Sequence, residues 1–441
     1  MHLGLGAFSR SHLAWYTARA LDARDWGISA YTGRSRELAE VLTTQDGLYT
    51  LIERSAEGDR ASIIENVVEA HVGGDLASLI ADISADETVI ISLTITEAGY
   101  RVGVDGLLDS TDSHVRADLA ALSNIEAEPN PSAIAVSTAI GRLVLGLDAR
   151  RRACSGPITV MSCDNLPNNG SLLREALLGM AEAIPDTAAW CKQMVSFAST
   201  SVDRITPSIS PEEQEELAAT YGDRAPVIAE PFSDWIIEGE FPAGRPAWES
   251  AGARFTDDLE PWESRKLWLL NGAHTLLASL GQLRGHRTVA EAITDPVCLH
   301  AVNSFWDEAE RHLPATLGLT EYRSALHERF ANARIEHQLS QIAIDTPTKL
   351  RLRVMPVAVR ERESGREADA CATVIASWLA AGEQRLVPLG IEAADTGTAF
   401  SWDHAVLAVE SLSTKLAADG AFLSAVRDEL DRVRHILSAA R

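Results

Sequence analysis

Three polar residues with chemical potential lie close together in the second half of the chain. Lys266 offers an amine, Asn271 an amide and His274 an imidazole, at relative positions i, i+5 and i+8. Apolar residues recur at helical spacing from Pro261 to Leu280, which predicts a helix. At about 100° per residue the three side chains fall within an arc of about 140°, spread over roughly 12 Å. Such a face could take a proton from an alcohol while its carbon loses hydride.

The same three residues could instead have a purely structural role. In it Lys266 is solvated, and Asn271 and His274 make capping bonds. Glu263 lies one turn before Lys266. It could pass protons to solvent or tune the amine, or it could be an ordinary surface residue.

Composition excludes some classes of partner. The chain has 441 residues, of which 46% are hydrophobic and 23% charged, as expected for a globular protein of two or three domains. Its formal charge is −24, which argues against nucleic acid or an anionic membrane as a partner. An anionic substrate would need a local cationic pocket.

Targeting and metal-binding signals are not found in the sequence. There is no apolar run of about 18 residues, and the chain begins without a basic and apolar leader, so we expect a cytoplasmic protein. The five cysteines are scattered and include no CxxC, which indicates reduced thiols. Without paired cysteines or HExxH, we expect a mechanism that uses no metal.

Two regions differ in their hydrophobic pattern. Up to about residue 240, short apolar runs alternate with helical stretches, as βαβ units do; from about Phe255 the pattern is almost entirely helical. We predict an α/β fold with a Rossmann-type domain at 1–245, built on a parallel sheet, and an α-helical catalytic domain at 246–441. The helix that carries Lys266 follows the junction directly, so we expect it to face an interdomain cleft, where ligands commonly bind. The predicted strands are His2 to Leu5, Gly27 to Thr32, Val89 to Ile95, Ile158 to Cys163 and Met194 to Ser199.

The N-terminus carries a glycine motif. Gly4 and Gly6, with Ala7 and Phe8, follow the first predicted strand and open a helix. Two glycines permit a tight turn and let a pyrophosphate approach the backbone at the helix N-terminus. Ser9 replaces the third glycine of the usual fingerprint. Either this first strand is very short, or the true start codon lies upstream of Met1. We expect a dinucleotide here, with Thr94 after a neighbouring strand as a further contact.

The residues after the second strand leave the choice of dinucleotide open. An acid there would bind the ribose 2′-hydroxyl, but none occurs before Glu37. Arg34 and Arg36 could bind a 2′-phosphate, or both could be solvated. NAD is the expected cofactor, and NADP remains the alternative.

Polar residues follow three apolar strands, and ligands of open α/β sheets bind beyond the carboxyl ends of strands. Asn165 and Asn271 could both donate to one oxygen. We assign Asn168 and Asn169 to a turn and a helix cap. Asp203 could bind substrate or pair with Arg204.

With these residues assembled, the chain resembles the polyol-specific long-chain dehydrogenases and reductases, nearly from end to end. The matching stretches are Gly4 to His12, Gln45 to Tyr49, Leu93 to Glu97 with Gly99 and Tyr100, Ser162 to Asn165 with Asn169 and Gly170, Val202 to Pro207, Trp235 to Glu238, Phe241 and Pro242 with Arg245 and Pro246, Lys266 to His274, and Gln341 to Asp345 with Lys349.

The resemblance implies a zinc-independent enzyme with a Rossmann-type domain and a helical domain. It implies Lys266 as general base and Asn165 and Asn271 as oxyanion-binding residues. It implies substrate contacts from His274, Asp203 and Lys349.

Departures from the family pattern bear on substrate. Ser35 and Arg36 stand where mannitol dehydrogenases tend to carry an acidic pair, and Gln341 stands where they tend to place an arginine. The pattern from Gln341 to Lys349 and Arg353 is more similar to the hexuronate reductase branch. Lys349 and Arg353 could neutralise a uronate carboxylate, or Arg353 could be a surface residue.

We therefore expect hydride transfer between a nicotinamide cofactor and an open-chain sugar acid, D-mannonate to D-fructuronate. The alternative substrates are polyols (mannitol to fructose, arabinitol to xylulose). A dinucleotide-binding sensor without catalysis is the alternative of another class. The sequence does not indicate the oligomeric state.

Overall fold

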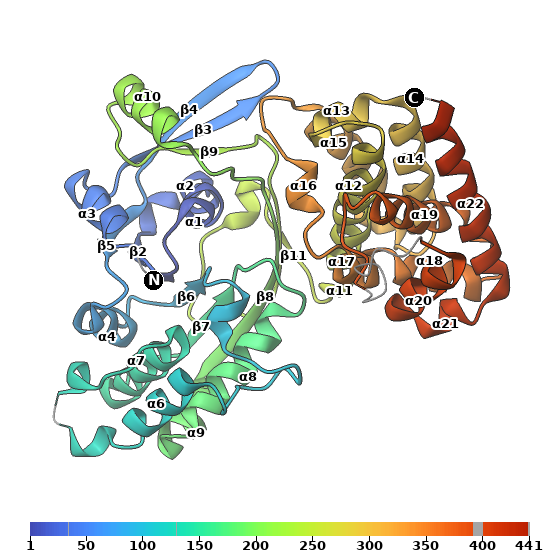
Figure 1. Cartoon of the computed structure of the whole chain (residues 1–441). Coiled ribbons are helices and arrows are strands. Elements are labelled where there is room, and N and C mark those ends of the chain that lie inside the picture. The colour runs from blue at the N-terminus through green and yellow to red at the C-terminus, as the bar shows by residue number, and fades with distance from the viewer. Residues whose placement is uncertain (34, 129, 391–399, 440–441) are drawn as a thin grey trace. The chain divides into compact units, whose positions relative to one another are not determined.

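The computed structural model describes residues 1–33, 35–128, 130–390 and 400–439, with only the backbone for 436–439. The chain divides into two compact units, Met1–Glu260 and Pro261–Arg441, which are described separately (Figure 1). The sequence placed this division at 245/246. It falls later because β11 (Arg254–Phe255) pairs in parallel with β10 (Asp234–Glu238) and so belongs to the first unit's sheet.

An eight-stranded sheet forms the centre of the first unit, in the order β11-β10-β8-β7-β6-β1-β2-β5. All pairings are parallel except β8 with β10, so the predicted parallel Rossmann-type sheet is confirmed. The strands not yet bounded are β1 (His2–Leu3), β2 (Ile28–Tyr31), β5 (Val67–His71), β6 (Ile90–Leu93), β7 (Ile158–Ser162) and β8 (Val195–Asp203).

Both faces of this sheet are covered. Successive residues of a strand point to opposite faces, and here they enter different cores: Ile91 and Val160 pack into one cluster, Ile90 and Met161 into the other. Every residue of β6 and β7 is buried, which explains why these strands are continuous apolar runs in the sequence.

Helices and a smaller sheet complete the first unit. The helices are α1 (Ala7–Ser11), α2 (Leu13–Arg19), α3 (Glu37–Thr44), α4 (Leu76–Ser84), α5 (Glu97–Tyr100), α6 (Ser113–Leu122), α7 (Ala139–Ala153), α8 (Asn169–Ala181), α9 (Pro185–Met194) and α10 (Pro211–Tyr221). The second sheet, which the sequence analysis did not predict, is β4 (Gly58–Ile64), β3 (Tyr49–Ser55) and β9 (Val227–Ala229). β3 pairs antiparallel with β4 and parallel with β9.

The second unit is helical throughout its described part, as predicted. Its helices are α11 (Glu260–Arg265), the π-helix η5 (Lys266–Gly272), α12 (Ala273–Leu283), α13 (Val289–Thr294), α14 (Pro296–Glu310), α15 (Leu319–Ala331), α16 (Leu339–Ile342), α17 (Thr346–Arg353), α18 (Met355–Glu363), α19 (Asp369–Glu383), α20 (Trp402–Leu412), α21 (Thr414–Ala417) and α22 (Gly420–Ala439). α12 packs against α13, α14, α16, α17 and α19. It is buried on nearly all sides, as a central helix must be.

None of the described helices has both the length and the apolar character needed to cross a membrane.

Gly4 is the tightest point of the first unit. Its amide donates to the Tyr31 carbonyl at 2.9 Å, and its φ is +105°. A Cβ at this position would lie 2.0 Å from the carbonyl oxygen of Thr94. β1 therefore ends in a turn that only glycine can make between its two neighbouring strands. At Gly6 a Cβ would meet nothing closer than the Gly4 carbonyl, at 3.6 Å.

We predict that Gly4→Ala lowers the Tm of the full chain by about 4–8 °C, since left-handed backbone and overlap with a carbonyl together cost at least about 2 kcal/mol. Gly6→Ala is the matched control and should shift the Tm by less than about 2 °C. Thermal unfolding followed by circular dichroism measures both. Equal destabilisation by the two variants would show that the turn is not constrained as the structure indicates.

Candidate active site

A cavity of about 510 Å³ lies at the carboxyl ends of β1, β6 and β7. It brings together most of the first unit's predicted site residues. Its lining consists of Gly4, Gly6, Ala7, Phe8, Ser9, Thr94, Thr96, Glu97, Cys163, Asp164, Asn165 and Leu166. The open space beside Gly6 suits the close approach of a phosphate to the backbone, so these residues fit a dinucleotide.

Side-chain hydrogen bonds fix the turn that carries the glycines. Thr94 Oγ1 donates to the Gly4 carbonyl at 2.8 Å and lies 3.1 Å from Nε2 of His2. Burial lowers the pKa of His2 to about 3, so its ring is neutral. Ser9, the replacement for the third glycine, accepts a hydrogen bond from the Gly6 amide at 3.0 Å. The Ser9 side chain therefore stabilises this turn with a hydrogen bond that a glycine at the same position could not make.

A buried carboxyl group holds the loop after β6. Asp164 accepts hydrogen bonds from the amides of Ile95 and Thr96, both at 2.9 Å, and from the Tyr100 hydroxyl at 2.7 Å. Burial is the main reason that its pKa is raised. Thr96 has φ +65°, a strained backbone of the kind found at functional sites. Asp164 was not among the predicted site residues. The sequence feature that could have indicated it is an acidic residue just after a buried strand.

The asparagines after β7 divide into two roles. Asn165 is exposed and lines the cavity. Asn169 is buried and bonds the carbonyls of Asp164 and Thr200, at 2.8 and 2.7 Å, and the Thr200 amide at 2.9 Å. Asn168 occupies the N-cap position of α8 without a side-chain capping bond. Asn169 is thus structural, while Asn165 contributes to the surface of the cavity.

Asp203 is the last residue of β8 and Arg204 follows it, but their side chains lie in different environments. Asp203 is the last, buried residue of the strand. The Arg204 guanidinium pairs with Glu53 at 2.8 Å and donates to the carbonyls of Ser11 and Glu230, at 2.6 and 3.0 Å. The Arg204 guanidinium therefore pairs with Glu53 and not, as the sequence allowed, with Asp203.

Of the two arginines predicted after the second strand, Arg36 is exposed at the start of α3. Arg34 lies outside the described residues.

The stretch from Pro261 to Leu280 is helical as predicted, but the α-helical geometry assumed for its centre is wrong. Between α11 and α12, residues Lys266–Gly272 form the π-helix η5. In a π-helix each turn spans an i→i+5 hydrogen bond. Lys266 and Asn271, five positions apart, therefore lie roughly one turn apart on one side of the helix. The angle between these two side chains around the helix axis is therefore smaller than the roughly 140° expected for a regular α-helix.

Tertiary contacts support the widened turn. Trp306 Nε1 donates to the Leu269 carbonyl at 2.7 Å. The Asn271 carbonyl accepts from Thr275 Oγ1 at 2.9 Å and from Arg353 Nη1 at 3.3 Å. A Cβ at Gly272 would lie 2.5 Å from the Phe305 ring. The Leu269 and Asn271 carbonyls thus accept hydrogen bonds from side chains, and the glycine at 272 leaves room for the Phe305 ring.

His274 lies in a cluster of cationic and imidazole groups. It is buried. Its ring packs against Phe330 in a tilted arrangement with centroids 4.8 Å apart, and it meets His337 edge-on, also with centroids 4.8 Å apart. Burial and then the nearby His337, Arg329, Arg353 and Lys349 hold the pKa of His274 well below its usual value. Its imidazole is therefore neutral at physiological pH, able to donate from one nitrogen and accept at the other.

Two polar atoms of this cluster have no hydrogen-bond partner among the described residues. They are Nε2 of His274 and Nδ1 of His337, both buried. Buried polar atoms are nearly always satisfied, so the two imidazoles mark a place for a polar ligand. The sequence analysis found His274 but missed His337 and Arg329, which no local pattern connects to it.

Lys349 and Arg353 both belong to α17. Lys349 Nζ donates to the Ile342 carbonyl at 2.8 Å, and burial lowers the pKa of this lysine. Burial also lowers the pKa of Arg353 to about 10, so its guanidinium stays charged. Arg353 donates to Thr275 Oγ1 at 3.1 Å as well as to the Asn271 carbonyl. It is therefore part of the cluster and not a plain surface residue.

Comparisons with known proteins identify the family to which both units are similar. Residues 1–250 match the mannitol dehydrogenase Rossmann domain, and residues 258–429 match the mannitol dehydrogenase C-terminal domain. D-mannonate oxidoreductase of Escherichia coli is 36% identical over 394 residues, which cover 86% of this chain and 79% of that protein.

Mannitol 2-dehydrogenases are similar to the same extent. The protein from Cereibacter sphaeroides is 37% identical over 359 residues, covering 78% of this chain and 72% of the relative. The structure of the Pseudomonas fluorescens mannitol 2-dehydrogenase in ternary complex with NAD and D-mannitol superposes with a TM-score of 0.76 at 32% identity. That match covers 100% of this chain and 92% of the other.

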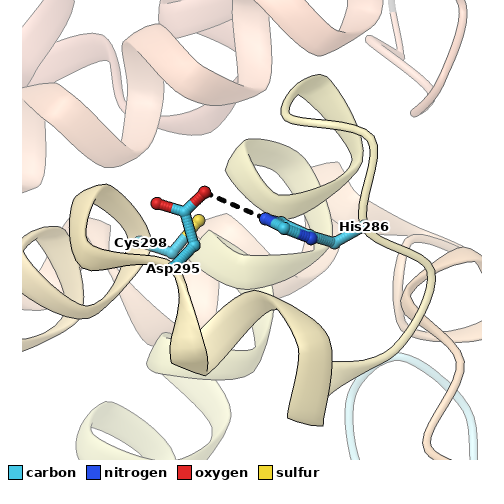
Figure 2. Close-up of side chains that lie close together, drawn as sticks. All are labelled: His286, Asp295 and Cys298. Carbon is cyan, nitrogen blue, oxygen red and sulfur yellow. Dashed lines mark hydrogen bonds and ion pairs between the residues drawn. The ribbon is translucent and has the colours of Figure 1, made fainter.

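A second polar cluster of the helical unit has ligand types that metals use. Ligand atoms of His286, Asp295 and Cys298 lie within 4.8 Å of one another, and Asp295 contacts His286 at 3.0 Å (Figure 2). Asp295 also pairs with Arg284 at 2.5 Å and caps α14 through the Val297 amide at 2.8 Å. Burial raises the pKa of the Cys298 thiol to about 12, and the Asp295 carboxylate is already engaged by Arg284 and by the start of α14. The cluster is explained as a helix cap.

We predict that Asp295→Asn lowers the Tm by about 3–6 °C at pH 7, since it removes the ion pair with Arg284 and weakens the hydrogen bond with His286 at a nearly buried carboxylate. Burial acts to raise the pKa of Asp295, but its hydrogen bonds outweigh burial and lower the pKa from 3.8 to about 2. The stabilisation is therefore present above about pH 4 and is lost as the pH falls toward 2. Thermal scans between pH 7 and pH 3 should show the gap between wild type and variant shrinking. The control is Asp307→Asn, which removes an exposed ion pair of the same helix. A gap that does not change with pH would contradict the assignment.

Proposed function

The chain belongs to the mannitol dehydrogenase family of oxidoreductases, and from this premise we propose that it is an NAD-dependent dehydrogenase that interconverts D-mannonate and D-fructuronate. D-mannonate oxidoreductase and mannitol 2-dehydrogenase are similar to it in nearly equal degree. The choice between an anionic and a neutral substrate therefore depends on the chemistry of the helical unit.

The cationic cluster around His274 is the observation that supports a sugar acid. The chain has a formal charge of −24, yet Arg329, Lys349 and Arg353 all act on this one buried imidazole. The exposed Asp345 carboxylate opposes the lowering of the pKa values of Lys349 and Arg353, and a bound anion would add a second compensating charge. A uronate carboxylate would provide that compensation and charge-assisted hydrogen bonds, while a neutral polyol would not.

The residues around the π-helix have the types required for the chemical step. In the reducing direction Lys266 gives a proton to the oxygen that becomes the hydroxyl, and in oxidation it takes that proton back. Asn165 and Asn271 donate hydrogen bonds to the same oxygen; neutral amides stabilise developing charge without titrating. The neutral His274 imidazole orients the substrate. The turn of Gly4 and Gly6 would hold NAD, which would accept or supply the hydride.

The proposal is tested by following NADH oxidation with D-fructuronate, D-tagaturonate and D-fructose, and NAD reduction with D-mannonate and D-mannitol. We expect D-fructuronate and D-mannonate to give the highest kcat/KM. A clear preference for fructose and mannitol would favour the second candidate, a mannitol 2-dehydrogenase, which the similarity to such enzymes supports. Binding of NADH without turnover of any substrate would favour a non-catalytic sensor.

We predict that Lys266→Ala lowers kcat by about 100-fold or more, the usual loss when a general acid–base group is removed. The Kd for NADH should stay within about 2-fold, because the lysine acts on the substrate oxygen. Lys415→Ala, at an exposed lysine of the same unit that pairs with Glu363, should leave kcat unchanged. Near-normal turnover of the Lys266 variant would remove this lysine from the mechanism.

We predict that Arg353→Ala lowers kcat/KM for D-fructuronate by about 10- to 100-fold, the range of a charge-assisted contact. Its kcat/KM for D-fructose should fall by less than about 5-fold, the part due to lost support of the Asn271 carbonyl. Arg351→Ala, at an exposed arginine of the same helix, is the control. Equal losses on both substrates would mean that Arg353 only supports the π-helix.

A further inference from the structure

His337 is a second imidazole beside His274, and neither the fold nor the proposed reaction gives it a role. Its Nδ1 atom is buried and has no hydrogen-bond partner among the described residues, and the same holds for Nε2 of His274. The two rings meet edge-on with centroids 4.8 Å apart. Because buried polar atoms are nearly always satisfied, two such nitrogens on neighbouring rings indicate a polar ligand that contacts both residues.

Other imidazoles of the helical unit have partners within the chain. His312 Nε2 lies 2.6 Å from a carboxylate oxygen of Glu361, and His327 Nε2 lies 3.1 Å from the side-chain oxygen of Asn303. Each of these rings therefore has a structural hydrogen bond, which Nδ1 of His337 lacks. Ring packing does not explain a histidine at position 337, since a phenylalanine would pack there without burying a polar atom.

The backbone around His337 is fixed by its neighbours. The His337 carbonyl accepts a hydrogen bond from the Val289 amide at 3.0 Å, and the Leu339 amide donates to the Arg287 carbonyl at 2.9 Å. A Cβ at Gly281 would lie 2.8 Å from the Leu339 side chain, so this segment packs directly on α12, the helix that carries His274. The imidazole is therefore held in position by the protein itself, as precise recognition of a ligand requires.

Both rings are neutral at physiological pH, which limits the chemistry of the ligand. Burial and then the cations Arg329 and Lys349 lower the pKa of His337, and the pKa of His274 is held well below its usual value. A neutral imidazole has one donor and one acceptor nitrogen. A hydroxyl group both donates and accepts, so it satisfies either nitrogen in either tautomer. A carboxylate only accepts, and an ammonium group only donates and would meet the nearby cations.

We propose that Nδ1 of His337, together with Nε2 of His274, binds hydroxyl groups of the open-chain substrate. This inference rests on the proposed function, because it presupposes that a polyhydroxylated sugar occupies the site. Neighbouring carbons of such a sugar each carry a hydroxyl, which suits two nitrogens on adjacent rings. Sugar acids and polyols share these hydroxyls, so His337 acts on both classes of substrate, whereas Arg353 acts on the carboxylate of a sugar acid.

Three variants separate the Nδ1 atom from the ring that carries it. His337→Phe keeps a ring without nitrogens and should lower kcat/KM about 10-fold for D-fructuronate and D-fructose alike, the effect of one hydrogen bond. His337→Asn keeps a polar atom at the Nδ1 position and should stay within about 3-fold of wild type. His337→Gln places its polar atoms at the Nε2 position and should lose as much as His337→Phe. The Kd for NADH should stay within about 2-fold in all three.

Substrates that lack one hydroxyl identify the group that His337 binds. The probes are the sugar that reacts faster, D-fructuronate or D-fructose, with its hydroxyl removed at C3, C4 or C5. For wild type, one of these removals should lower kcat/KM by about 10-fold. In His337→Phe the same removal should cost less than about 2-fold, because its hydrogen-bond partner is already absent.

His300→Phe is the matched control, since it makes the same change at an exposed histidine of α14 in the same unit. Its kcat/KM should equal that of wild type for every substrate. If circular dichroism shows that His337→Phe does not fold, the comparison of His337→Asn with His337→Gln carries the test, and the deoxygenated substrates are measured with His337→Gln.

The outcomes separate this inference from the proposed function. A loss in His337→Phe that depends on no single hydroxyl assigns Nδ1 to an ordered water and overturns the inference, as does unchanged kcat/KM; both leave the proposed function standing. Faster reaction of D-fructose than of D-fructuronate overturns the proposed substrate, while dependence on one hydroxyl still supports the role of His337. Absence of turnover with every sugar overturns both.

Discussion

Hydrogen bonding of the main-chain carbonyls in the π-helix Lys266–Gly272 is the constraint on which the helical unit depends. Carbonyls of this widened turn accept hydrogen bonds from side chains as well as the main chain. Trp306 and Thr275 supply donors, and Arg353 supplies one from another helix. Because Arg353 also lies beside His274, the group that supports the helix geometry is also part of the cationic cluster. Backbone geometry and electrostatics are coupled in one side chain.

Burial decides the protonation of the groups in that cluster. Desolvation disfavours the charged form, and neighbouring cations disfavour it further. Both effects lower the pKa of His274, whereas the guanidinium of Arg353 keeps its charge. The cluster thus combines a neutral imidazole with fixed positive charge, which suits recognition of an anionic substrate through a neutral hydrogen-bonding partner.

The first unit shows the same use of buried polar groups at strand ends. The Asp164 carboxyl holds the strained Thr96 backbone, and the Thr94 hydroxyl holds the glycine turn. These bonds fix the loops that line the cavity, whose surface includes Gly6 and Asn165. Rigid support from within leaves the ligand-facing groups free to act.

The sequence by itself determined the features that local patterns encode. The buried runs of β6 and β7 and the glycine turn are properties of short segments, and they predicted the parallel sheet correctly. The hairpin of β3 and β4 was missed because much of β4 is exposed and lacks a clear apolar alternation. Only the tertiary structure decided the π-helix, whose support comes from Trp306 and Arg353, far along the chain. It also decided that His337 and Arg329 join His274, and that Arg204 pairs with Glu53. The physical reason is the same in each case: hydrogen bonds and charge pairs depend on distance in space, which a local pattern does not contain.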